Sequence, residues 1–104
     1  MVQKTLDPTR IAPFCQRRRI REFALFGSAA REELVPDSDI DVLVDFEPRS
    51  NYSLLDLVDM QEELQELFGR RVDLLTRPAL KRMRNRFRKA NIEAGLRTVY
   101  VSRP

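Results

Sequence analysis

Two aspartates placed two positions apart are the residues of this chain whose spacing most directly indicates chemistry. Asp39 and Asp41 open a stretch, residues 39–46, in which every second residue is apolar, as in a strand with one face in the core. Both carboxylates then leave the other face, about 6.5–7 Å apart. Such a pair repels unless a proton or a cation lies between the groups, and Mg²⁺ binds through carboxylates together with substrate phosphates. The alternative is a strand edge whose acids only prevent pairing.

A third carboxylate lies in the next apolar stretch, residues 71–75, which contains Asp73. If this strand pairs beside the first, Asp73 joins Asp39 and Asp41. Three carboxylates on adjacent strands can hold two metal ions about 3.5–4 Å apart, an arrangement that serves phosphoryl-type displacement. Otherwise Asp73 is an acid at a strand end, exposed to water.

Gly27 and Ser28 follow the apolar run 23–26 and precede a helix expected over residues 29–34. Glycine lets a phosphate approach the backbone closely, and the free amides of a helix start favour an anion. Arg31 could reach the same anion or pair with a nearby acid. A plain turn with Ser28 as N-cap is the alternative. Next to a carboxylate cluster, however, a phosphate cradle predicts a nucleoside-triphosphate site.

Composition narrows the chemistry further. The 104-residue chain has no histidine and one cysteine, Cys15, which excludes an intrachain disulfide and histidine-based catalysis and makes zinc improbable. It contains no apolar run of the roughly 18–20 residues that a membrane span needs, and no signal-peptide core. We expect one domain over residues 1–104, in the cytoplasm, without a membrane partner.

Charge is segregated along the chain. Residues 32–66 contain twelve acids and one base, whereas residues 70–104 contain eleven bases and two acids. The basic half could guide a triphosphate or grip an acidic partner, for example through Arg84 and Arg88; alternatively, both blocks are solvated helix faces. Aromatic residues are too sparse there to favour nucleic acid.

The remaining pattern predicts an α/β domain without repeats. A helix is expected from Asp7-Pro8 to about residue 18, with Ile11, Phe14 and Cys15 buried. Ser53 and Asp56 resemble a capping box before a helix that Gly69 ends, with an apolar stripe of Leu54, Leu57, Val58, Leu64, Leu67 and Phe68. We expect a basic helix over residues 79–93, with Leu80, Met83 and Phe87 along one side of it. Residues 98–101 could form a last strand.

Gly27-Ser28, ten further residues and then Asp39-Ile40-Asp41 resemble the nucleotidyltransferases of the DNA polymerase beta superfamily. The phrase from Ser38 to Asp41 is most similar to the minimal nucleotidyltransferases, the MNT-type antitoxins encoded beside HEPN toxins. The resemblance extends over about residues 20–75. The chain departs from it at Ala29, where an aromatic residue is usual, and at Glu32, where glycine is frequent.

This resemblance implies a nucleotidyltransferase fold, a small mixed sheet with helices packed against it. It implies ATP as substrate and two Mg²⁺ ions held by Asp39, Asp41 and Asp73, with Asp73 also assisting deprotonation of the acceptor. Nucleotide contacts would come from Gly27, Ser28, Arg31 and Ser38. The implied reaction is transfer of AMP to a hydroxyl, typically of tyrosine, on a HEPN-type toxin. A homo- or hetero-oligomer is possible, and the sequence does not distinguish the two. Neutralisation of that partner by complex formation alone is the alternative.

Overall fold

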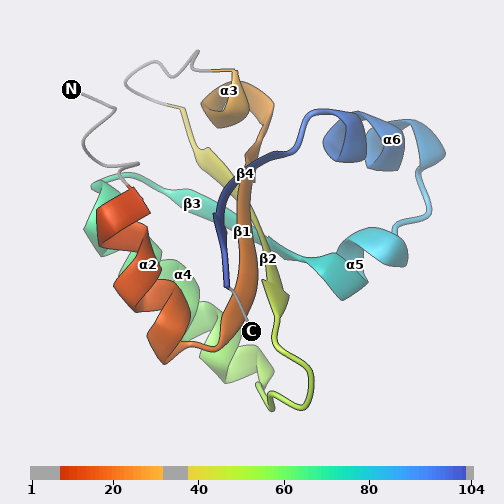
Figure 1. The fold of residues 1–104 in the computed structure, drawn as a ribbon. Helices are drawn as coiled ribbons and strands as arrows, with labels where there is room; N and C mark the ends of the chain where they lie inside the picture. Colours follow the sequence, from red (N-terminus) through yellow and green to blue (C-terminus); the bar gives the residue numbers. More distant parts are fainter. Residues whose placement is uncertain (1–7, 32–37, 103–104) are drawn as a thin grey trace.

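A four-stranded mixed sheet forms the centre of the molecule (Figure 1). The structure, a computed structural model, describes residues 8–31 and 38–102. The strands are β1 (Ile20–Phe26), β2 (Ile40–Phe46), β3 (Val72–Thr76) and β4 (Arg97–Val101), in the order β3-β2-β1-β4. β1 is antiparallel to β2 and β4, and β2 is parallel to β3. The predicted mixed sheet flanked by helices is confirmed, and residues 97–101 are a strand.

The first face of the sheet carries the larger core. Helices α2 (Pro8–Arg17) and α4 (Leu54–Phe68) cover it (Figure 1). Phe23 lies at its centre and makes edge-to-face contacts with Phe14 of α2 and Phe68 of α4, each with ring centroids 6.5 Å apart. The predicted burial of Ile11, Phe14 and Cys15 is confirmed. The expected N-cap Asp7 lies outside the described residues.

The second face of the sheet has a smaller apolar centre. Here α5 (Arg77–Lys81) and α6 (Arg86–Ala94) pack on the opposite side from α2 and α4 (Figure 1). Its buried residues are Ala24, Phe26, Leu43, Leu80 and Ile92. Acidic side chains occupy the two ends of this second face, so the predicted division of β2 into a core face and a carboxylate face is confirmed.

The single basic helix expected over residues 79–93 is wrong, because the structure has two helices there. α5 ends at Lys81, and Asn85 starts α6 as an N-cap whose side chain accepts a hydrogen bond from the Arg88 N–H. Asparagine satisfies a free amide at a helix start, and so it favours a new helix over continuation of the old one. As a result Phe87 lies on an exposed side of α6, with 85% of its surface accessible, rather than on an apolar stripe.

The apolar stripe of α4 is also only partly as expected. Met60, Leu64 and Phe68 form the buried row, while Leu54 and Val58 are 80% and 52% exposed. Residues 58 and 60 are two positions apart and therefore point to opposite sides of a helix. The predicted ends of α4 are confirmed: Ser53 and Asp56 form the capping box, and Gly69 adopts the left-handed conformation, with φ of 67°.

Ser53→Ala is expected to lower the free energy of unfolding by about 1 kcal/mol, because the Asp56 N–H loses the acceptor that begins α4. Urea denaturation measures this. Ser53→Asp is the control, since aspartate caps a helix as well as serine does. Equal losses of unfolding free energy in both variants would mean that the hydrogen bond to the Asp56 N–H does not contribute to stability.

Candidate active site

The parallel pairing of β2 with β3 brings two of the predicted site residues together. Asp41 and Asp73 are register partners, as are Ile40 and Val72. The Ile40 N–H donates to the Arg71 carbonyl at 2.9 Å, which holds the two strand starts in this register. Neighbouring strands lie about 4.8 Å apart, so both carboxylates leave the second face side by side. Asp39, two positions before Asp41, belongs to the same end of that face.

Gly27 lies directly against Asp41. Phe26 is the antiparallel register partner of Asp41, and Gly27 follows with φ of +65°. A Cβ atom on Gly27 would lie 2.5 Å from the Asp41 carboxylate oxygen Oδ2, closer than nonbonded atoms approach. The positive φ strains any other residue, and a Cβ at this position would have to displace the Asp41 carboxylate. The structure thus places the glycine–serine turn and the acids in one site.

The helix after Gly27 differs from the expectation. α3 comprises Gly27–Ala30, so it begins two residues earlier than predicted, and its N-cap position is Phe26 rather than Ser28. The expected end of this helix, with Glu32 and Leu34, lies outside the described residues. A helix of four residues has little dipole to offer an anion. Any phosphate affinity of this turn must come from the close approach at Gly27 and the half-buried Ser28 hydroxyl.

Arg31 and Ser38 lie on either side of residues 32–37. Arg31 is exposed at the end of α3, where its N–H donates to the Gly27 carbonyl at 3.3 Å. Ser38 is half-buried, and its carbonyl accepts from Arg70 Nη1 at 3.3 Å. These contacts attach Arg31 to the glycine turn and Ser38 to the start of β3. Both residues therefore border the acid-bearing end of the second face.

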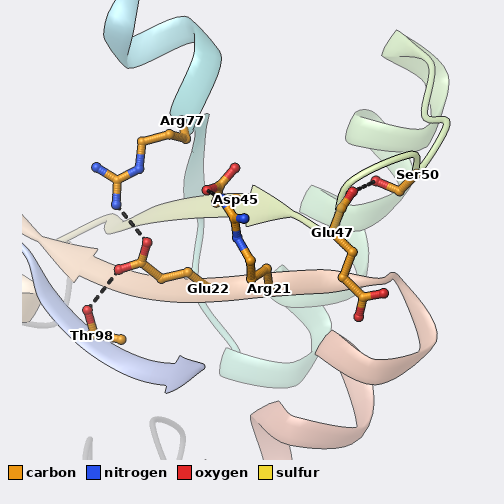
Figure 2. A network of polar contacts seen from close by, with 7 residues as sticks. All are labelled: Arg21, Glu22, Asp45, Glu47, Ser50, Arg77 and Thr98. Atoms are coloured by element: carbon orange, nitrogen blue, oxygen red, sulfur yellow. Dashed lines mark hydrogen bonds and ion pairs between the residues drawn. The ribbon is translucent and has the colours of Figure 1, made fainter. Parts of the chain in front are cut away.

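At the opposite end of the second face, the acidic side chains of Glu22 and Asp45 are paired with arginines (Figure 2). Glu22 accepts from Arg77 at 2.7 Å and from Thr98 at 2.9 Å, and Asp45 accepts from Arg21 at 2.6 Å. Each of these carboxylates has a guanidinium partner at hydrogen-bond distance. This end of the sheet is electrostatically balanced by the chain itself.

The site end is not balanced in the same way. Asp39 pairs with Arg71 at 3.1 Å, between two largely exposed side chains. Asp41 and Asp73 form no ion pair within the part of the chain that the structure describes. Burial raises the pKa of the Asp41 carboxyl, and the charges of Asp73 and Asp39 raise it further; the Arg88 guanidinium opposes them. The half-buried Asp41 therefore carries negative charge that no ion pair among the described residues balances.

The arrangement offers oxygen donors but not a closed cage. Within residues 8–31 and 38–102, no three acidic, histidine or cysteine side chains converge on a point that could hold a metal ion. One of the three carboxylates, that of Asp39, is engaged by Arg71 instead. Sequence reasoning did not identify Arg71 and Arg88 as the cations that act on these acids. The excess of basic residues after residue 70 was the signal in the sequence that could have pointed to them.

These features, a glycine–serine turn beside in-register carboxylates on a small mixed sheet, are those of the nucleotidyltransferase class. A family model described as a nucleotidyltransferase domain matches residues 9–97. The chain therefore belongs to the nucleotidyltransferase domain family.

Two sequence relatives are similar over most of this region. Protein adenylyltransferase MntA of Thermococcus cleftensis is 46% identical over 66 residues, which are 64% of this chain and 65% of that protein. MJ1217 of Methanocaldococcus jannaschii, named in the same class of protein adenylyltransferases, is 39% identical over 87 residues, 83% of this chain and 81% of its own. The match to MntA thus covers slightly less than two thirds of that protein.

Solved structures agree in fold. A minimal nucleotidyltransferase superposes with a TM-score of 0.69 at 32% identity, covering 93% of this chain and 95% of that one. A toxin–antitoxin complex with AMP-PNP contains a chain that superposes with a TM-score of 0.70 at 15% identity, covering 92% of this chain and 74% of that one. At that identity the second match supports the fold alone. As a separate observation, no helix among the described residues is long and apolar enough to cross a membrane.

Asp41→Asn is expected to raise the free energy of unfolding at pH 7, by about 0.5 kcal/mol or less in this solvent-screened site. The raised folded-state pKa of Asp41 means that ionisation is costlier in the fold than in the unfolded chain. The favourable contribution of the protonated carboxyl is therefore full below about pH 4 and is lost as the pH rises through the folded-state pKa. Urea denaturation at pH 7 and below about pH 4 tests this. The gain in unfolding free energy of Asp41→Asn over the unsubstituted chain should vanish at the acidic pH.

Asp45→Asn is the matched control, because Asp45 lies on the same strand and face but pairs with Arg21. It should lower stability at pH 7, by no more than about 1 kcal/mol. A similar loss of unfolding free energy in Asp41→Asn would show that a favourable contact stabilises the ionised Asp41. It would contradict the interpretation that ionisation of Asp41 destabilises the fold.

Proposed function

We propose that this chain transfers AMP from ATP to a tyrosine hydroxyl of a HEPN-type partner toxin and so acts as its antitoxin. The observation that carries the proposal is the register that sets Asp41 beside Asp73 and against Gly27. Carboxylates adjoining a glycine–serine turn suit the transfer of a nucleotide.

The names of similar proteins support this reaction. Thermococcus cleftensis MntA is named a protein adenylyltransferase. A tri-AMPylated Shewanella oneidensis HEPN toxin has been solved in complex with its MNT antitoxin, whose fold matches here with a TM-score of 0.65 at 15% identity, covering 98% of this chain and 74% of the matched chain. A partner toxin and AMP transfer are therefore the most direct extension to this chain.

In the proposed reaction the acceptor hydroxyl oxygen attacks the α-phosphorus of ATP. A bond forms between that oxygen and phosphorus, the bond between the α-phosphorus and the bridging oxygen breaks, and pyrophosphate leaves with the electron pair. Asp73, exposed beside Asp41, would accept the hydroxyl proton. Gly27 and Ser28, with Arg31 and Ser38 at the border, would position the phosphates.

The donor chemistry at this end of the sheet suits Mg²⁺, which binds through one or two carboxylates together with substrate phosphates and so does not need the three converging side chains that the described residues lack. Asp39, Asp41 and Asp73 offer only carboxylate oxygens, the ligands that Mg²⁺ prefers, and the charge on half-buried Asp41 lacks an ion-pair partner among the described residues. Asp39 would have to leave Arg71, which costs little because both side chains are largely exposed. When bound, Mg²⁺ would lower the acceptor hydroxyl's pKa and neutralise the leaving phosphates.

Neutralisation by complex formation alone is the second candidate. Leu54 and Leu55 on the first turn of α4 are 80% and 75% exposed, with Val58 one turn further. An apolar patch of this kind favours contact with another protein. It lies on the helix layer of the first face, away from the acids, so binding could occur without catalysis.

Asp39→Asn and Asp41→Asn are each expected to reduce transfer at least about a hundredfold while the chain stays folded, because each removes a carboxylate ligand for the Mg²⁺ that would neutralise the reacting phosphates. The assay incubates the pure chain with ATP labelled at the α-phosphate, Mg²⁺ and the protein encoded by the neighbouring gene. Chelation of Mg²⁺ should have the same effect. Asp45→Asn, four positions along β2, should retain activity.

Label on the neighbouring protein that depends on Asp41 supports the enzyme. A stable unlabelled complex that forms equally well with Asp41→Asn would support the binding module and overturn the catalytic proposal.

Gly27→Ala is expected to abolish transfer because its Cβ would displace the Asp41 carboxylate. Gly69→Ala is the matched control: Gly69 has nearly the same φ, +67° against +65°, but open space around its Cβ position. Both variants should lose about 1 kcal/mol of stability from backbone strain, measured by urea denaturation. Loss of transfer in both would point to strain alone and would argue against the contact with Asp41.

A further inference from the structure

Helix α4 presents apolar and acidic residues together on the side that is turned away from the sheet. Its buried row packs into the larger core. The helical period therefore places four other residues on the opposite side: Leu55, Asp59, Glu62 and Glu66. All four are exposed, as is Val58 one turn after Leu55, and these five residues form the acidic face of α4. None of the three acids forms an ion pair with another described residue.

The start of α6 presents the opposite charge around one aromatic ring. Phe87 is 85% exposed. The arginines on both sides of it in the chain are exposed as well, and together with Phe87 they form the basic face of α6: Arg84, Arg86 and Arg88. Residues 74–92 contain no acid. Within residues 8–31 and 38–102, the side chains of these three arginines form no ion pair or hydrogen bond.

The acidic face and the basic face are complementary in two ways. Each has exposed apolar surface, Leu55 and Val58 on one and Phe87 on the other, and contact between these side chains would remove that surface from water. Each also has charged residues beside its apolar part, and the charges are of opposite sign. Opposite charges around an apolar contact favour encounter and fix the register of two surfaces.

The two faces lie on opposite sides of one molecule. α4 covers the first face of the sheet and α6 packs on the second (Figure 1). Because the sheet lies between them, the acidic face and the basic face of one chain cannot contact each other. They can be paired only when a second molecule supplies one of them.

A second copy of this chain is the occupant that matches both faces at once. A polyanion such as RNA would neutralise the arginines of the basic face, but the acids of α4 would repel it and the apolar residues beside them would stay exposed. Another copy carries the matching surface for each face. The segregation of acids into residues 32–66 and of bases into residues 70–104 supplies the two halves of such a contact.

We propose that this chain associates with a second copy of itself, the acidic face of α4 of one copy against the basic face of α6 of the next. The two surfaces differ, so the contact is heterologous, and association continues head to tail unless a ring closes. Helices of 15 and 9 residues offer less than the about 800 Å² per partner of a standard interface. The association is therefore weak and falls as salt screens the charges. It does not depend on the proposed AMP transfer.

The test is sedimentation equilibrium of the full chain over a concentration series at low and high salt. The average mass of the unsubstituted chain should rise with concentration at low salt and stay near that of one chain at high salt. The double variants Leu55→Ala/Glu62→Ala and Arg86→Ala/Phe87→Ala should each weaken association at least about tenfold. All four side chains are exposed, so both variants should keep the fold, which circular dichroism checks. Glu93→Ala, an exposed acid of α6 outside both faces, is the matched control and should associate as the unsubstituted chain does.

A mixture of the two double variants distinguishes this contact from other modes of association. Leu55→Ala/Glu62→Ala keeps the basic face, and Arg86→Ala/Phe87→Ala keeps the acidic face. Each variant alone should stay monomeric, and the mixture should form a 1:1 dimer that does not grow further, because only one intact pair of faces is present.

An unsubstituted chain whose mass does not rise with concentration would overturn the inference. So would a mixture that stays monomeric, or weakening by one double variant only, since the second result would mean that like faces pair. If the chain stays monomeric and Arg86→Ala/Phe87→Ala instead loses affinity for a single-stranded RNA oligonucleotide, the basic face would belong to nucleic acid and the inference would be wrong. In none of these results is AMP transfer by the unsubstituted chain affected.

Discussion

The parallel pairing of β2 with β3 is the constraint on which the rest of this site depends. With Ile40 opposite Val72, Asp41 falls opposite Asp73, and both side chains leave the second face. Side chains alternate along a strand, so a slip by one residue would turn Asp73 into the core and an apolar residue outward. Burial of Ile40, Val42 and Val72 against α4 therefore holds the carboxylates in place.

The two ends of the second face differ in how many of their acidic side chains form ion pairs. Glu22 and Asp45 form ion pairs with Arg77 and Arg21 (Figure 2). These pairs join β1 to α5 and β1 to β2. Asp41 and Asp73 stand on the same strands or beside them without such partners among the described residues. Residual repulsion at one end lowers stability, which is common where a site must bind a ligand of opposite charge.

Sequence reasoning succeeded where a local rule decides the structure. Alternation along residues 39–46 predicted the two faces of β2, and the Ser53–Asp56 spacing and Gly69 predicted the ends of α4. It failed where tertiary contacts decide. Leu54 and Val58 look like core residues, but the row of Met60, Leu64 and Phe68 takes the sheet-facing side of α4. Asn85 looks like an ordinary helical residue, yet it divides the basic segment and sets the position of Arg88.

By itself the sequence determined the chemistry available to this protein: carboxylates, hydroxyls and arginines without histidine, with Asp39 and Asp41 on one side of a strand. These follow from residue type and from a period of two, which need no partner strand. Only the tertiary structure decided that Asp73 lies beside Asp41 and that Gly27 lies against the Asp41 carboxylate. Those placements depend on strand register and helix packing between residues far apart in the chain, which local spacing does not encode.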